Sequence, residues 1–172
     1  YSLSYHGLPY TARIRAALAA AGWNNKAVWI TESGVPVCDD FPGPHCPSPW
    51  RATAEEQAAY IWQNIAYTRL AGGGPIFHFM LHDDCGNVVA VDSPDGFGIH
   101  KNESSSYCSP SNGQGRIGAT AFRMANEYFP GTELVWANIQ EQKARRVAFF
   151  HRESRERRLL TFAITDQPAV AQ

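Results

Sequence analysis

Short apolar runs alternate with helical stretches along the first three quarters of the chain. Residues 28–31 (Val-Trp-Ile-Thr) form one run of β-branched and aromatic residues, and Pro75 to Leu81 form another. Runs of this length and composition indicate buried strands, and a short strand is also expected over residues 1–6. Apolar residues at helical spacing predict three helices, over residues 10–21, 54–70 and 115–128. The order strand, helix, strand, helix, strand, helix is typical of a parallel sheet with crossover helices.

The predicted helices have recognisable ends. Gly22 follows the first helix as a C-terminal cap, and Thr53 precedes the second as an N-cap. Glu55 and Glu56 lie in the first turn of the second helix, where they complement its dipole. The residues expected to face the core are Ile14, Leu18 and Ala21 in the first helix, Ala59, Ile61, Ile65 and Leu70 in the second, and Ile117, Ala121, Met124 and Ala125 in the third.

After Gly131 the pattern changes to short, strand-like segments. They cover residues 134–136, 146–150 and 159–164 and are separated by charged turns. In the turn from Arg152 to Arg158, acidic residues interleave the basic ones, which indicates an exposed hairpin tip or edge rather than a nucleic-acid patch. We therefore expect residues 1–131 to form the α/β part of the chain. Residues 132–172 are expected to form a small antiparallel β-domain or β-extension.

Composition narrows the class of protein. The chain has 172 residues, 44% hydrophobic residues and a net charge of −1, which is enough for one domain with a core. The near-neutral charge gives no support for nucleic-acid binding, and no apolar run approaches membrane-spanning length, so we expect a soluble chain with neither kind of partner. Because the sequence begins at Tyr1 without a methionine or signal peptide, we expect a processed product or a fragment of something longer.

The four cysteines form two local pairs, neither with the spacing of a metal site. Cys38 and Cys46 bracket one turn-rich loop, and Cys85 and Cys108 bracket a longer one. Four cysteines allow three pairings, of which local pairing is the simplest, and each closed loop would contribute about 2.5 to 3.5 kcal/mol in the chain-entropy model. Asn102 begins an Asn-Glu-Ser glycosylation sequon. These features favour secretion into an oxidising, extracellular setting; the alternative is four free thiols in the cytosol.

Polar residues follow the predicted strands at their carboxyl ends. Glu32 ends the run of residues 28–31 and is followed by a turn over residues 33–36. A carboxylate at the carboxyl end of a buried parallel strand lies where (β/α)8 barrels place their catalytic groups. The alternative is a solvated glutamate that opens a loop. A complete barrel needs about 250 residues. Because three strands alone would leave two open hydrophobic edges, either a partner chain completes the sheet or the units form a small open sheet.

The segment Lys26–Gly34 (Lys-Ala-Val-Trp-Ile-Thr-Glu-Ser-Gly) resembles the seventh strand of retaining glycoside hydrolases in the large barrel clan that includes cellulases and β-xylosidases. An acidic, alanine-rich helix, a glycine-rich turn and an apolar strand that ends near an aspartate follow in the same order. Gly96–Ile99 is similar to the stretch that leads into the last helix of those enzymes. The resemblance implies an α/β fold, a partial (β/α)8 barrel with strands six to eight and their helices, followed by the small β-domain that many of these enzymes carry.

The resemblance also implies a catalytic role for Glu32. In this family the glutamate at that place is the nucleophile, which attacks the anomeric carbon and forms a glycosyl-enzyme. The chemistry needs a second carboxyl group about 5 to 5.5 Å away as acid and base, and in the family it follows an asparagine at the end of strand four. The Asn-Glu pairs of this chain, at Asn102 and Asn126, lie in a loop and a helix instead. The acid/base is therefore expected on a missing or separate N-terminal half, and the isolated chain is not expected to hydrolyse glycosides.

Further residues are candidates for substrate binding. Relatives often end strand six in His-x-Tyr, where His6 matches but Leu8 replaces the tyrosine, and Tyr5 is the candidate to compensate. The alternative for His6 is a half-buried histidine at a strand end. His82 and Asp83 stand where relatives commonly show a sugar-stacking tryptophan, with loop solvation as the competing interpretation.

Among the tryptophans, Trp50 is the best candidate for sugar stacking, because it lies in the proline-rich loop just past Cys46. Trp29 and Trp62 are expected to pack in the core, since one lies in a strand and the other in a helix. No cofactor is expected. A metal site is not expected either, because the six histidines lack paired helical spacing and the Asp39-Asp40 and Asp83-Asp84 pairs would make only weak cation sites.

Two functions of different classes follow. In the first, the chain is the nucleophile half of a secreted retaining glycoside hydrolase, whose partners are a carbohydrate substrate and the N-terminal half of the barrel. In the second, it is a non-catalytic extracellular module on a degenerate barrel that binds glycan or serves in assembly. Fold analogy does not decide between them.

Overall fold

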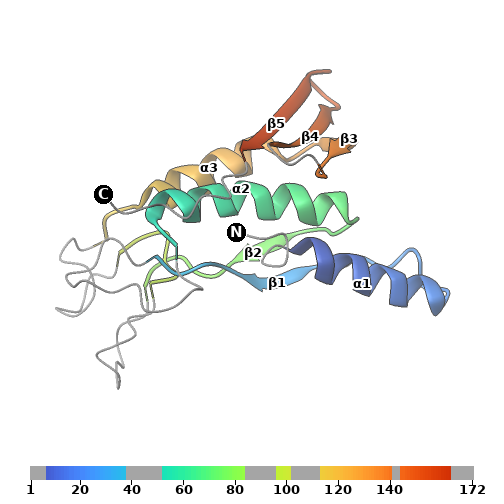
Figure 1. Cartoon of the computed structure of the whole chain (residues 1–172), viewed down its shortest axis with the longest axis horizontal. Helices are drawn as coiled ribbons and strands as arrows, with labels where there is room; N and C mark the ends of the chain where they lie inside the picture. Colours follow the sequence, from blue (N-terminus) through green and yellow to red (C-terminus); the bar gives the residue numbers. More distant parts are fainter. Residues whose placement is uncertain (1–6, 38–51, 84–95, 102–112, 141–143, 164–172) are drawn as a thin grey trace. The chain divides into compact units, whose positions relative to one another are not determined.

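The computed structural model describes residues 7–37, 52–83, 96–101, 113–140 and 144–163. The chain divides into two compact units, Tyr1–Glu127 (the first unit) and Tyr128–Gln172 (the second unit). In these ranges the protein is mixed α/β, with three helices, a two-stranded parallel sheet and a three-stranded antiparallel sheet (Figure 1). None of the described helices has the length and apolar composition that crossing a membrane requires.

The first unit is built around a strand–helix–strand segment. Strand β1 (Ile30–Ser33) is joined through helix α2 (Ala54–Leu70) to strand β2 (Ile76–His78), and the two strands are parallel, as the alternating pattern predicts. Ile30 lies opposite Ile76 and Ser33 opposite His78. Three steps along β1 therefore match two steps along β2, which is a β-bulge at Thr31 and Glu32. The described strands do not close into a barrel.

Local signals end the helices where the sequence predicts. Helix α1 (Gly7–Ala20) is followed by Gly22 with a φ of 78°, and Trp23 N–H donates to the carbonyl of Leu18 at 2.8 Å. This bond pattern is the Schellman cap, which needs a residue in the left-handed region. At the start of α2, the Thr53 side chain accepts from the backbone of Glu56, and the Glu56 side chain accepts from the backbone of Thr53. Both predicted caps are confirmed.

The helix faces differ in part from those predicted. Ile61 of α2 and Ala121 and Ala125 of helix α3 (Ile117–Tyr128) are buried as expected. The predictions are wrong for the exposed residues Ile14, Ala21, Ala59, Ile117 and Met124. Small residues explain the difference, because they allow close approach. A Cβ atom at Gly118 of α3, for example, would lie 2.4 Å from Oε1 of Gln57. Helices that approach through small residues leave their larger apolar side chains at the flanks.

The parallel sheet has one covered and one exposed face in the described part of the chain. Tyr60 and Asn64 of α2 bond to Ser33, so α2 covers the first face. On the other face the Trp29 and Phe77 side chains are 57% and 51% exposed, with their ring centroids 6.1 Å apart. The prediction that Trp29 packs in the core is therefore wrong. The described residues place no second layer over this face, which a strand in a closed α/β core would have.

The second unit is an antiparallel meander, as the sequence predicts. Strands β3 (Thr132–Asn138), β4 (Ala144–His151) and β5 (Arg157–Ala163) pair in chain order, and the charged segment after His151 forms the β4–β5 turn. Val147 and Phe149 of β4 are fully buried, and Phe149 packs edge-to-face on Phe129 at 5.3 Å between ring centroids. This unit has its own small apolar core.

Candidate functional site

Glu32 is exposed at the carboxyl end of β1. Along this strand Ile30 and Ser33 are half-buried, whereas Thr31 and Glu32 between them are exposed. Strict alternation would put Glu32 on the same face as Ile30. The bulge adds one residue, so Ser33 returns to the face that α2 covers and the carboxylate of Glu32 stays accessible. Bulges are common next to active sites for this reason, since they re-aim a side chain.

Ser33, the residue after Glu32, is held by two side chains of α2. Its Oγ atom lies 2.6 Å from the hydroxyl of Tyr60 and accepts from Nδ2 of Asn64 at 2.8 Å. Burial raises the pKa of Tyr60, although the hydrogen bond to Ser33 opposes the shift, so this phenol stays protonated at neutral pH. The end of β1 is therefore anchored by neutral groups.

His78 lies opposite Ser33 at the end of β2. Its ring is largely buried and tilted against Phe122 of α3, with the ring centroids 5.8 Å apart. Burial lowers the pKa of His78 to about 4, so the imidazole is neutral at neutral pH. His78 is not among the site residues that the sequence predicts. The available signal was a polar residue inside the apolar run from Pro75 to Leu81. We call Glu32, Ser33 and His78 the strand-end site.

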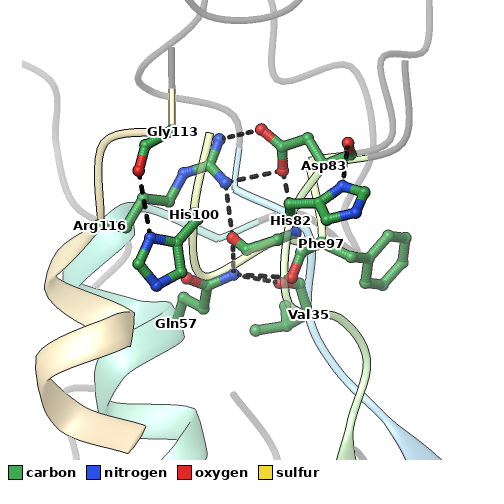
Figure 2. Close-up of polar contacts among 9 residues, drawn as sticks. Val35, Gln57, His82, Asp83, Phe97, His100, Gly113 and Arg116 are labelled. Atoms are coloured by element: carbon green, nitrogen blue, oxygen red, sulfur yellow. Dashed lines mark hydrogen bonds and ion pairs between the residues drawn. The ribbon is translucent and has the colours of Figure 1, made fainter. Parts of the chain in front are cut away.

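Asp83 is placed in the interior instead of at an accessible subsite. It is fully buried and forms two parallel bonds with the guanidinium of Arg116, at 2.7 and 2.8 Å (Figure 2). The Gly98 N–H also donates to its Oδ1 atom at 2.9 Å, and Arg116 donates to the Gly98 carbonyl at 2.6 Å. With its two oxygens engaged in this way, the buried carboxylate joins the chain after β2 to the start of α3.

Gln57 of α2 completes this buried network. Its Nε2 group faces the carbonyl oxygens of Val35, Phe97 and Gly98, at 3.2 to 3.3 Å (Figure 2). Gly98 fits because a Cβ atom there would lie 2.2 Å from the backbone nitrogen of Asp83. The network thus fixes the short segment of residues 96–101 against α2 and the chain after β2.

His82 remains exposed beside the network. Its Nδ1 atom lies 3.0 Å from the carbonyl oxygen of Asp83. Because a carbonyl can only accept, Nδ1 must carry the proton, and Nε2 is then the acceptor of the neutral ring. His82 can therefore accept a hydrogen bond from a ligand hydroxyl, and its role in substrate binding stays a prediction.

The other predicted site residues lie outside the residues that the structure describes, and their roles stay predictions. They are Tyr5, His6 and Trp50 for substrate binding, Cys38, Cys46, Cys85 and Cys108 for disulfides, and Asn102 for glycosylation. Within the described ranges, no three His, Cys, Asp or Glu side chains gather into a group that could hold a metal ion.

No protein-family model matches this chain, and a search of curated proteins finds no significant relative. The strand-end site is therefore the feature that bears on the function of this chain.

Proposed function

We propose that this chain carries the nucleophile side of a retaining glycoside hydrolase active site, with Glu32 as the nucleophile. The observation that carries the proposal is the exposed carboxylate in the bulge at the carboxyl end of a parallel strand. Ligands and catalytic groups of α/β folds gather at that end of the sheet. In the same proposal, β1 and β2 are neighbouring strands of a (β/α)8 barrel whose remaining strands come from an N-terminal half.

The reaction would proceed through a covalent intermediate. Glu32 attacks the anomeric carbon as the bond to the leaving oxygen breaks, and a second carboxyl group protonates that oxygen. The same group then removes a proton from the water that releases the sugar. Asp83 is paired with Arg116, and Glu56 caps α2, so neither is suited to this task. The acid/base would come from the N-terminal half.

The exposed face of the parallel sheet supports a missing half. Trp29 and Phe77 lie on it, and Leu81, just after β2, is 66% exposed. Large exposed apolar groups of this kind mark interaction surfaces. We propose that the N-terminal half covers them, in a secreted protein that acts on carbohydrate.

The test separates the nucleophile from the acid/base. The native protein that contains these residues is incubated with 2,4-dinitrophenyl 2-deoxy-2-fluoro-β-glucoside and with the corresponding xyloside. Dinitrophenolate leaves without protonation, so labelling does not depend on the acid/base, and the fluorine slows hydrolysis of the glycosyl-enzyme. Mass spectrometry of the intact protein and its peptides should find one fluoroglycosyl group on Glu32.

Two variants serve as controls. Glu32→Gln should abolish the label, whereas Glu55→Gln should retain it, because Glu55 is also exposed but lies in the first turn of α2 and not at a strand end. Labelling that persists in Glu32→Gln, or a wild-type protein that takes no label from either reagent, refutes the proposal. Glycan binding without labelling would favour the non-catalytic module.

A further inference from the structure

We infer that Asn64 is a positioning residue of the strand-end site, because its single amide group joins Ser33 of that site to the start of α1. The inference rests on the proposed function for its catalytic consequence. The Oδ1 atom of Asn64 accepts from the Gly7 N–H at 2.7 Å, and its Nδ2 group donates to Oγ of Ser33 at 2.8 Å. Gly7 directly follows His6, and Ser33 directly follows Glu32. One side chain of α2 thus contacts the residues that directly follow two of the predicted site residues, His6 and Glu32.

The chemistry of the two partners determines how the amide is oriented. A backbone N–H can only donate, so the carbonyl oxygen of Asn64 must face Gly7 and its NH2 group must face Ser33. The side chain is 3% exposed, which leaves little access for water to replace either partner. Only an amide supplies an acceptor and a donor at this fixed separation. A carboxylate would lose the donor, and alanine would lose both.

The contact with Gly7 depends on close packing. A Cβ atom at Gly7 would lie 2.2 Å from Oγ1 of Thr68 and 3.3 Å from Oδ1 of Asn64. The backbone at the start of α1 therefore rests directly on α2, at a distance that a larger residue would increase. The amide of Asn64 therefore fixes the first residue of α1 against α2.

The contact between Asn64 and Ser33 also restrains the end of β2, because Ser33 is bonded to the residue that follows that strand. The Ser33 carbonyl accepts from the Phe79 N–H at 2.9 Å, while its side chain bonds to Asn64 and Tyr60. Loss of the Asn64 amide would remove one of these restraints from the residue beside the bulge. Glu32 would then sample a wider range of positions, and a displacement of about 1 Å at a reacting group can cost about 100-fold in rate.

The first experiment measures the rate of Glu32 labelling by the fluoroglycosides in folded variants. Asn64→Ala should lower the first-order labelling constant at saturating reagent by about tenfold to 100-fold, with a smaller change in the half-saturating concentration. Ser33→Ala should lower it as well, whereas Ser33→Thr, which keeps the hydroxyl, should restore it. Ala66→Gly is the matched control, because Ala66 is fully buried in the same helix and its methyl side chain cannot form a hydrogen bond to β1.

A purely structural role predicts a different result. Asn64→Ala and Ala66→Gly would then both lower the midpoint of thermal unfolding, and both would label at the wild-type rate well below that midpoint. This outcome, or failure of Ser33→Thr to restore labelling, overturns the inference.

Amide hydrogen exchange tests the positioning without any chemistry at Glu32. In Asn64→Ala, exchange should rise at Gly7, which loses its acceptor, and at Phe79, which bonds to Ser33. The Ile30 N–H, which donates to the Pro75 carbonyl at the other end of β1, should exchange as in the wild type. If both amides respond but the wild type takes no label, the positioning contact stands and the proposed function fails. If Phe79 does not respond, the inference fails whatever the labelling shows.

Discussion

We expect the buried pair of Asp83 and Arg116 to contribute strongly to the stability of the first unit. Asp83→Asn keeps the shape of the side chain and the acceptor for the Gly98 N–H, but it removes the negative charge. It also turns one of the two positions opposite the guanidinium into an NH2 group, which cannot accept a bond from Arg116. The guanidinium, with a side chain only 1% exposed, then loses the charge of Asp83 while it stays buried.

The expected cost follows from this burial. Breaking a buried ion pair by removing one partner typically destabilises a protein by about 3–5 kcal/mol, because the remaining charge stays desolvated. Replacing both partners by apolar residues of similar volume is often neutral. We therefore expect Asp83→Asn to lower the free energy of unfolding of the first unit by about 3–5 kcal/mol. The double variant Asp83→Leu with Arg116→Met should recover most of that loss, which gives a strongly non-additive cycle.

Urea unfolding followed by tryptophan fluorescence can measure this cycle. Four of the five tryptophans belong to the first unit, and Trp136 is in the second, so Trp136→Phe gives a background that reports on the first unit alone. A separate reporter is needed because two units need not unfold in one step. The prediction is refuted if Asp83→Asn lowers the free energy of unfolding by less than about 1 kcal/mol. It is also refuted if the loss in the double variant equals the sum of the losses in the two single variants.

Two further predictions concern the same unit. First, the pKa of His78 is about 4 in the folded state and near 6.5 when unfolded, so the unfolded state binds more protons between these values. Stability should be complete above about pH 6.5 and fall towards pH 4, and His78→Gln should flatten this part of a urea-midpoint profile; an unchanged slope would contradict it. Second, a Cβ atom at Gly34 would lie 1.8 Å from the Phe79 carbonyl oxygen, whereas one at Gly22 meets nothing within 4 Å. Gly34→Ala should therefore severely destabilise the first unit, while Gly22→Ala should cost only about 1 kcal/mol for its positive φ, and equal thermal midpoints would refute this reasoning.

Local interactions explain the features that could be predicted from the sequence. Thr53 and Glu56 form a capping box within four residues, and Gly22 supplies the left-handed residue directly after α1. Such signals need no distant partner, so the types and approximate ends of the helices could be predicted. The short apolar segments between charged turns in the last quarter of the chain likewise predicted the antiparallel strands. Glu32 could be selected as a candidate because it ends an apolar run.

Contacts between distant segments explain the features that could not be predicted from the sequence. The bulge that exposes Glu32 depends on the register between β1 and β2. Because a long helical connection joins the two strands, their register could not be predicted from the sequence. The Asp83–Arg116 pair spans 33 residues, so nothing near Asp83 indicated that its carboxylate would be buried. Helix periodicity gave an apolar stripe, but close approach through Gly118 decided which side of α3 faces α2. In each case the deciding energy is desolvation or packing against residues far along the chain, which no local pattern contains.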